Sequence, residues 1–459
     1  MDPVYKALVE IAGEDHVSNR PEELHTYSRD LGTTESRLPD YVVAPRTTEQ
    51  VQAVVRLANR ESIPVVPLGG GLSLAGLAVP LRGGIALDMK RMDTILEVNE
   101  KARYVVIEAG VSQGKLISYL HRHHPNLRHS EPQAPTPATI AGNIAIHGQG
   151  DLAQPYGFNS DMVNGLEVVL PTGEVCKIGS CAVSPGWFTL HPLPDLGLFL
   201  GWFGTTGIIT RLSLRLFPLK RIREVEQFVV EDPELVPEVI YKVTHTEMAE
   251  DVFAGTQSTI PARVGLHHVT VYITADSEKE LEFKTSLIWD DALGEYIRSG
   301  DGGFADLLPP MKARFAARPG MLLSTVCDVL QGGGFEYVGG IMPVETYPQC
   351  CERGAAIYSK HGIPQLMIAR VIGRAHAMMF AWAYPFNRGD AESVNKAREA
   401  VHETDDLALD LGGTIWKPGV YGQKRLMERM DPGTLQLMKR VKGLLDPNGI
   451  MNPGNWEVA

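Results

Sequence analysis

The first half of the chain has the pattern of apolar and polar residues that predicts a β-α-β unit. Short apolar runs at residues 41–43 and 63–68 enclose a segment with apolar residues at the spacing of one helical face. These residues are Val51, Val54, Val55 and Ala58. Thr47 and Gln50 precede the helix with the spacing of a capping box. We therefore expect a helix with one face on a sheet, and a second strand that ends at a run of glycines.

More apolar runs predict strands on both sides of residue 218. In the first half they lie at residues 84–89, 104–110, 165–170 and 207–217, between glycine and proline turns. Later runs, at residues 269–276, 335–344 and 378–386, alternate with helical patterns at residues 347–362 and 391–413. This predicts an α+β fold with two lobes, in which the second lobe is an antiparallel sheet with helices on one face. The expected units are residues 1–218, residues 219–425, and a C-terminal segment, 426–459, that returns to the first unit.

Length and composition agree with a folded protein of more than one domain. The chain has 459 residues and a net charge of -12, which disfavours binding to nucleic acid. Its five cysteines lack the paired short spacings of zinc or iron-sulfur ligands. The first residues have no basic stretch followed by an apolar core, so we expect a cytoplasmic protein.

The strongest candidate for a binding site is the glycine-rich stretch at residues 67–76. Consecutive small residues let backbone N–H groups converge on one anion, so a phosphate group is the expected ligand. No Gly-Lys-Ser/Thr follows, and the spacing is not that of a Rossmann turn. A second small-residue segment, 135–150, can run beside a flat ring system and bond to it through the main chain. A third begins at Tyr156, and a fourth, 203–210, again offers bare backbone.

These segments, in this order, resemble the FAD-binding domain of the vanillyl-alcohol-oxidase (PCMH-type) superfamily. Its members include D-2-hydroxy-acid dehydrogenases, such as the glycolate oxidase flavoproteins and D-lactate dehydrogenases, and 4-alkylphenol oxidases. The resemblance implies a two-lobed PCMH-type FAD-binding domain with an α+β cap domain. It also implies that residues 69–76 wrap the FAD pyrophosphate, that residues 139–143 line the flavin, and that residues 446–454 return to it. The implied cofactor-binding residues are Pro67, Gly69, Gly70, Gly71, Leu72, Ser73, Gly76, Pro135, Thr136, Thr139, Gly142, Asn143, His147, Gly207, Ile209 and Asn452.

The candidate catalytic residues lie in the expected cap. They are His376, Lys417, Arg374, Arg370 and Trp416. His376 is a candidate general base, or else a hydrogen-bonded interior histidine. The cations would hold a substrate carboxylate or phenolate, or would only pair with acids elsewhere in the chain. The stretches 369–376 and 412–419 lack the acidic residues that a divalent metal would need, so we expect no metal.

The resemblance implies an enzyme that removes a hydride from a hydroxyl-bearing carbon to FAD. A 2-hydroxy acid such as lactate or glycolate would use the cations. An aromatic alcohol or 4-alkylphenol would use Trp382, Tyr384 and Trp416 as walls. The alternatives are a 4-alkylphenol oxidase, or a flavin-binding electron-transfer subunit beside an iron-sulfur or cytochrome protein. We expect a homo-oligomer or a subunit of a complex. We also expect dissociable FAD, because residues 69–71 carry no side chain, although Tyr337 leaves covalent attachment open.

Overall fold

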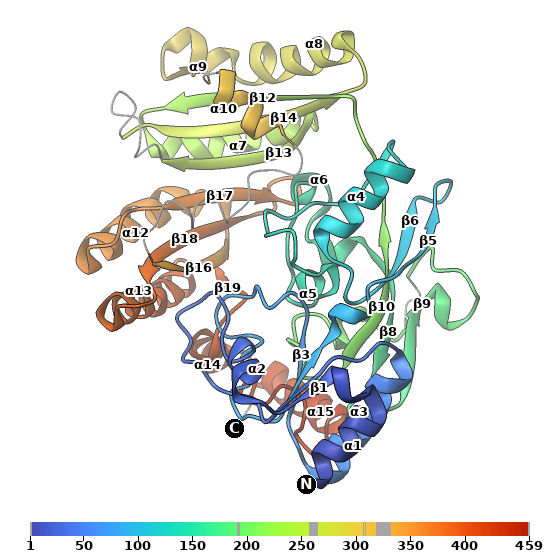
Figure 1. The fold of residues 1–459 in the computed structure, drawn as a ribbon. Helices are drawn as coiled ribbons and strands as arrows, with labels where there is room; N and C mark the ends of the chain where they lie inside the picture. The colour runs from blue at the N-terminus through green and yellow to red at the C-terminus, as the bar shows by residue number, and fades with distance from the viewer. Residues whose placement is uncertain are drawn as a thin grey trace.

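The chain folds into two lobes that lie side by side (Figure 1). The computed structural model describes residues 2–190, 193–256, 265–305, 307, 309–317 and 332–457. We call residues 2–218 with residues 432–457 the first lobe, and residues 222–429 the cap. The two ends of the chain both lie at the bottom of the first lobe in Figure 1. Among the described helices, none is long and apolar enough to cross a bilayer.

The first lobe contains two main sheets. One has four strands in the order β1 (Val17–Ser18), β2 (Tyr41–Val43), β4 (Ile85–Asp88) and β3 (Val65–Leu68), of which the last three are parallel. The other is antiparallel, in the order β5 (Ile95–Asn99), β6 (Tyr104–Glu108), β10 (Ile208–Arg215), β8 (Val163–Val169) and β9 (Val175–Gly179). A small ribbon pairs β7 (Leu127–Arg128) with β11 (Phe217–Pro218). The helices are α1 (Pro3–Ala12), α2 (Pro21–Thr26), α3 (Thr48–Glu61), α4 (Gln113–His123), α5 (Ile140–Ala145), α6 (Ala153–Tyr156) and α15 (Pro432–Leu445).

Helix α3 buries the apolar residues whose spacing predicted it. Its four predicted core residues, spaced along one face, are all fully buried. The Thr47 hydroxyl accepts a hydrogen bond from the Gln50 N–H at 3.3 Å, which satisfies one free amide at the start of the helix. The helix ends at Ser62, whose backbone has the left-handed φ of 56°. The predicted β-α-β unit is therefore confirmed in the parallel pair of β2 and β3 on either side of β4.

The cap is built on one eight-stranded sheet. Its strands lie in the order β15 (Gly302–Phe304), β12 (Ile222–Val230), β14 (His267–Ala275), β13 (Ala249–Thr256), β17 (Met367–Ile372), β18 (Ala377–Asn387), β16 (Gly333–Met342) and β19 (Thr414–Trp416). All of these pairs are antiparallel. The helices are α7 (Val236–His245), α8 (Glu278–Ser286), α9 (Gly294–Ser299), α10 (Pro309–Ala316), α12 (Tyr347–His361), α13 (Ala391–Asp410) and α14 (Val420–Arg429).

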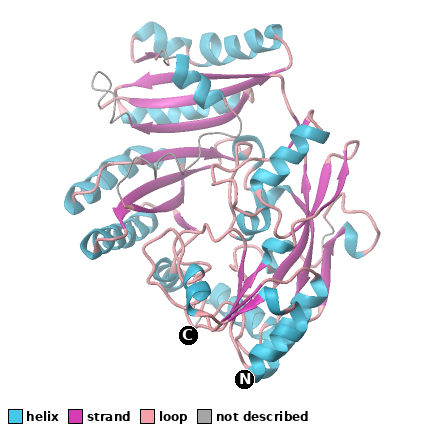
Figure 2. Cartoon of the chain, in the orientation of Figure 1, coloured by secondary structure: helices cyan, strands magenta, loops and turns pink. Residues whose placement is uncertain are grey.

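The two faces of the cap sheet have different neighbours, as the alternation of a strand requires. Residues such as Phe228, Val271 and Trp382 point to the outer face, where they form a core with residues of α7, α12 and α13. Figure 2 shows helices packed along this sheet. Residues such as Trp416 and Met379 point to the opposite face and pack with Phe158 of the first lobe. The inner face also carries α10, which packs on Tyr272, so the helices are not all on one side.

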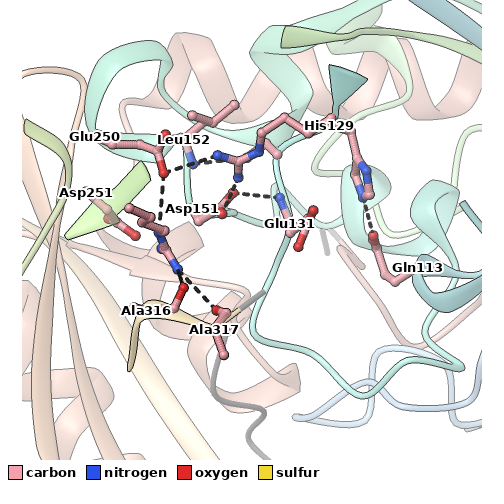
Figure 3. A network of polar contacts seen from close by, with 12 residues as sticks. Gln113, His129, Glu131, Asp151, Leu152, Glu250, Asp251, Ala316 and Ala317 are labelled. Atoms are coloured by element: carbon pink, nitrogen blue, oxygen red, sulfur yellow. Dashed lines mark hydrogen bonds and ion pairs between the residues drawn. The ribbon is translucent and has the colours of Figure 1, made fainter. Parts of the chain in front are cut away.

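A buried ionic network joins the two lobes (Figure 3). Arg128 of the first lobe forms ion pairs with Asp151 of its own lobe and with Glu250 of the cap, the latter at 3.1 Å. Arg223 of β12 reaches the same Glu250 carboxylate at 3.5 Å. The side chain of Arg128 is only 3% exposed, and those of Asp151 and Glu250 are 10% and 9% exposed. Ionic contacts shielded from water in this way hold the cap in one orientation on the first lobe.

The C-terminal tail closes the first lobe. Met451 pairs with Val65 of β3 in a parallel bridge, and the Asp446 carboxylate accepts N–H bonds from Ile450 and Met451 at 3.0 Å each. The Asn452 amide donates to the carbonyl oxygens of Leu77 and Phe203. The last residues of the chain thus hold together two segments that lie far apart in the sequence.

Loss of the interlobe arginine should destabilise the protein far more than loss of an exposed one. Arg128→Ala removes the buried cation shared by Asp151 and Glu250 and leaves Glu250 with the longer Arg223 contact. We expect this to lower the free energy of unfolding by about 3–5 kcal/mol. The matched control is Arg374→Ala, whose ion pair with Glu247 is more than half exposed and should contribute about 0–1 kcal/mol. Chemical denaturation of both variants measures the difference. Equal losses would contradict a structural role for the network.

Candidate active site

A cavity of about 340 Å³ lies between the first lobe and the cap. Three stretches of the first lobe line it, within residues 67–78, 134–146 and 199–209. The cap closes it with Gly333, Phe335, Tyr337 and Lys417. Most of its lining is apolar side chain or bare backbone. A volume of this size is typical of a cofactor or small-molecule site.

The cavity brings together most of the residues expected to bind the cofactor. Those that line it are Pro67, Gly69, Gly70, Gly71, Leu72, Ser73, Pro135, Thr139, Gly142, Asn143, Gly207 and Ile209. Gly76, Thr136, His147 and Asn452 do not line it. Three of these support its walls: the Gly76 N–H donates to Asp30, Asn452 ties down Leu77 and Phe203, and the His147 carbonyl accepts from Trp416 Nε1 at 2.7 Å.

The glycine loop and the second segment approach each other at backbone distance. A Cβ on Gly70 would lie 2.6 Å from the Pro137 carbonyl oxygen, and one on Gly69 would lie 2.0 Å from Thr139 Oγ1. At Gly71 the backbone has φ +66°, and a Cβ there would meet nothing within 4 Å. The loop thus packs tightly on one side and presents bare backbone to the cavity on the other. This is the form expected of a cradle for a pyrophosphate.

Two buried carboxylates that the sequence analysis missed hold this loop in place. Asp30 accepts hydrogen bonds from the Gly76 N–H at 2.8 Å and from the Ser73 hydroxyl at 3.2 Å. Glu336 of β16 accepts bonds from the Thr33 N–H at 2.6 Å and the Thr33 hydroxyl. The segment around residues 30–33 therefore links the glycine loop to the cap. Burial raises the pKa of Glu336 to about 7 and also raises that of Asp30.

Several non-glycine residues around the cavity have left-handed backbone conformations. They are Ala75, His147, Phe203, Lys417 and Asn452, with φ between 38° and 64°. Such conformations cost energy and persist only where the surrounding contacts fix them, which is most common at functional sites. Phe203 and Lys417 line the cavity, and the other three lie in or contact the segments that form its walls, which supports its assignment as the active site.

Lys417 has an unusual environment for a lysine. Its Nζ atom lies 3.7 Å from the centre of the Trp416 ring, and no acidic group among the described residues pairs with it. Burial lowers the pKa of Lys417 to about 7. Burial also lowers the pKa of nearby His147; Asp161 opposes this and the Lys417 charge adds to it. An amine with this pKa can exchange protons at neutral pH.

The structure does not bring His376 or Arg374 to the cavity. Strand β17 ends at Ile372, and residues 373–376 form a turn in which Gly373, Arg374 and Ala375 all have positive φ. Within this turn Arg374 and His376 are exposed, whereas Ala375 is buried. The backbone of this turn is anchored on α6, where the Arg374 N–H donates to the Gln154 carbonyl. The Arg374 side chain pairs with Glu247 at the surface. The expected base on an inner strand is therefore placed at the tip of a surface turn.

Other expected substrate contacts have structural partners instead. Arg370 is 2% exposed, makes a two-pronged ion pair with Asp251, and stacks over the Phe253 ring at 4.7 Å. Trp382 and Tyr384, proposed as walls for a phenol, are fully buried in the outer core of the cap. Trp416 lies behind Lys417 and does not itself line the cavity. Of the five catalytic candidates, only Lys417 lines the cavity.

Comparison with known families agrees with this geometry. Residues 39–179 match the family described as FAD binding domain, and residues 338–456 match the C-terminal domain of the FAD linked oxidases. The first match covers the glycine loop and the second small-residue segment. The second match begins within β16 and covers the rest of the cap, which includes Lys417, and the C-terminal tail.

Relatives and solved structures that match nearly the whole chain agree with these two family matches. A D-lactate dehydrogenase of Archaeoglobus fulgidus is 28% identical over 423 residues, which cover 90% of each chain. The 4-cresol dehydrogenase [hydroxylating] flavoprotein subunit of Pseudomonas putida is 24% identical and covers 98% of this chain and 94% of its own. The crystal structure of p-cresol methylhydroxylase with substrate bound has the same fold, with a TM-score of 0.85, 19% identity, and coverage of 99% and 96%.

This chain is an FAD-linked oxidoreductase, with an FAD-binding domain and the C-terminal domain of the FAD linked oxidases. It has the expected PCMH-type fold. The expected fold class and cofactor are thereby confirmed. The residues present fit FAD, because the cavity offers bare backbone at Gly71 for a pyrophosphate and continues along residues 139–143 to Lys417 and Tyr337. Which atoms of FAD each residue contacts remains a prediction from the resemblance.

The close packing of the glycine loop can be tested at Gly70. Gly70→Ala places a Cβ against the backbone of Pro137 and Ala138, so the loop must move, and we expect FAD affinity to fall by about tenfold or more, equivalent to ~1.4 kcal/mol. The matched control is Gly443→Ala in α15, where a Cβ meets nothing within 4 Å. Titration of apoprotein with FAD, followed by flavin fluorescence, measures both. Unchanged affinity of the Gly70 variant would argue against a cofactor role for the loop.

Proposed function

We propose that this enzyme oxidises a small hydroxylated aromatic compound, a phenol or an aromatic alcohol, whose hydroxyl meets Lys417. The observation that carries the proposal is the composition of the cavity wall. Among its described residues, Lys417 is the only cation, and Tyr337 is the only other residue with a titratable side chain. The remaining polar side chains, Ser73, Thr139 and Asn143, lie in the segments expected to hold FAD.

Aromatic residues surround Lys417. Tyr337 and Phe335 line the cavity beside it, and their ring centres are 6.0 Å apart. The Trp416 ring lies under the amine, 5.9 Å from the Tyr337 ring. Flat apolar walls with one polar group at the end suit an aromatic ring with a single hydroxyl.

Lys417 is suited to take the proton from that hydroxyl. At pH values above about 7 its amine is neutral and carries a free electron pair. After it accepts the proton, its positive charge can hold the substrate oxygen in place. When FAD is bound, it supplies the electron acceptor that takes a hydride from the substrate. In this proposal Lys417 has the role expected of His376.

A 2-hydroxy acid is the second candidate substrate. D-lactate dehydrogenases are 26% and 28% identical to this chain over about nine-tenths of its length. Such a substrate needs a cation for its carboxylate as well as a base for its hydroxyl. Lys417 would have to pair with the carboxylate, which would leave Tyr337 as the neighbouring proton acceptor. Burial raises the pKa of the Tyr337 phenol far above neutrality, which makes it a poor base.

The further partners are proposals from the sequence and the relatives. One relative is named as the flavoprotein subunit of a larger enzyme, so an electron-accepting protein partner, such as an iron-sulfur or cytochrome protein, is in keeping with this fold. We also propose that FAD is held without a covalent bond, because residues 69–71 carry no side chain. Acid precipitation tests this: yellow colour retained in the protein pellet would show a covalent link. Assignment to the cytoplasm rests on the sequence alone.

The substrate class can be decided by reduction of the bound flavin in the absence of oxygen. A panel of 4-substituted phenols, aromatic alcohols and 2-hydroxy acids is added in turn to the FAD-loaded protein, and flavin absorbance is followed. We expect the aromatic compounds to bleach the flavin and the aliphatic hydroxy acids to leave it oxidised. Bleaching by lactate or glycolate alone would establish the second candidate.

The role of Lys417 predicts a specific dependence on pH. Because the neutral amine is the active form, kcat/KM should rise as the pH increases through about 7 and then level off. Lys417→Met should lower kcat by about 100-fold to 10,000-fold and remove this inflection. The control is Lys424→Met, at an exposed position of α14. A Lys417 variant that kept the wild-type pH profile would exclude the amine as the base.

A further inference from the structure

A second cavity, of about 130 Å³, lies directly behind the active-site cavity. Two residues, Tyr337 and Lys417, line both cavities. The second cavity extends from them past Glu336 and Asp405 to Val420, which is 46% exposed, so it reaches the surface of the protein. It has room for several waters, because one water occupies roughly 30 Å³ in the liquid.

The walls of the second cavity carry more polar and charged side chains than those of the first, among them Thr33, Glu336 and Asp405. Asp405 of α13 is 3% exposed, and its side-chain carboxyl makes no hydrogen bond or ion pair with the part of the chain that the structure describes. Glu336, across the cavity, is 2% exposed and has Thr33 as its hydrogen-bond donor. Burial raises the pKa of both carboxyls. The two groups are close enough that the negative charge of Glu336 raises the pKa of Asp405 further.

Other titratable groups face these carboxyls from each element around the cavity. Asp30 of the first lobe lies near Glu336, and Asp406 of α13 lies near Asp405. At the outer end, the His402 ring stacks on the Tyr421 ring at 3.9 Å, and Arg398 lies beside them. The inner end is formed by Lys417 and Tyr337. Since like charges face each other here, burial and the neighbouring carboxyls both favour the protonated forms of Asp405 and Glu336.

Apart from Lys417 and Tyr337, none of the described residues that line the active-site cavity has a titratable side chain that could take the proton onward. Oxidation of the substrate breaks a C–H bond, at the carbinol carbon of an aromatic alcohol or at the benzylic carbon of a 4-alkylphenol, and bound FAD would accept this hydrogen with its electron pair. It also breaks the O–H bond of the hydroxyl group, whose proton goes to the base. Lys417 has then gained a proton that it must lose before the next turnover. Its neighbours in the first cavity are apolar or are expected to be covered by FAD.

We propose that the second cavity is the outlet for the substrate proton: Lys417 releases it to water there, and the carboxyls of Asp405 and Glu336 pass it to solvent. The inference rests on the proposed function of Lys417 as base. Each carboxyl accepts a proton on one oxygen and gives up the proton of the other, so neither is consumed. The step needs no reactant other than substrate, FAD and water.

The decisive variant is Asp405→Asn, which keeps the shape of the side chain but cannot pass a proton in this way. The matched control is Asp410→Asn on the same helix, because Asp410 pairs with Arg429 at the surface and does not line the cavity. A second variant, Val420→Trp, blocks the outer end from an exposed position and keeps the test open if the Asp405 variant does not fold.

The first measurement follows proton release during a single reduction of the flavin. A pH-indicator dye and the flavin absorbance are recorded together in weakly buffered, oxygen-free solution. In the wild type and in Asp410→Asn, release should keep pace with bleaching. In Asp405→Asn and Val420→Trp it should lag by about tenfold or more. Release that keeps pace with bleaching in both cavity variants would overturn the proposal.

The second measurement needs no substrate and so separates this proposal from the proposed function. Infrared spectra of the FAD-loaded protein at pH 7 should show an absorption band of protonated carboxyls that is reduced in Asp405→Asn and unchanged in Asp410→Asn, since Glu336 and Asp30 can contribute to it as well. If no compound of the panel bleaches the flavin but the band behaves as expected, the assigned substrate is wrong and the protonated pair stands. If the band is absent or unchanged in the Asp405 variant, the outlet is refuted.

Discussion

The cofactor groove depends on one close contact, in which Gly70 lies against the backbone of Pro137 and Ala138 and Gly69 lies against the Thr139 side chain, with no room for a further side chain between them. This contact leaves the opposite edge of the glycine loop bare and facing the cavity. Asp30 and the C-terminal Asn452 fix the segments on either side of it. A dinucleotide with two phosphates needs such a surface, because converging N–H groups are what binds an anion in a site poor in charged side chains.

A second constraint comes from the cap. Its sheet places Tyr337 over the cavity and directs the chain after β19 so that Lys417 enters the same space in a left-handed conformation. The network of Arg128, Asp151 and Glu250 holds the two lobes together, and therefore fixes how far the lysine is from the cofactor groove. An amine enclosed among aromatic rings without an acidic partner loses its charge easily. The same enclosure thus gives the site both its preference for a flat substrate and its base.

Structural features that depend on neighbouring residues could be predicted from the sequence, and contacts between residues far apart in the sequence could not. The glycines at 69–71 and the spacing of Val51, Val54 and Val55 each report a constraint met within a few residues, so the flavin groove and α3 were predicted from the chain alone. The expected roles of His376 and Arg370 depended on which way their side chains point. His376 falls in a turn that ends β17, and Arg370 is paired with Asp251, 119 positions away. Thr33 and Glu336 are 303 positions apart, and no local sequence pattern predicts the hydrogen bond between them.

The most direct test of the central claim is an experimental structure of the chain with FAD bound. We expect the pyrophosphate to lie against the amides of residues 69–76 and the flavin ring to lie between residues 139–143 and the cap, with Lys417 and Tyr337 facing the substrate side of the ring. A pyrophosphate bound away from the glycine loop, or a Lys417 side chain that points out of the cavity once FAD is bound, would contradict this arrangement.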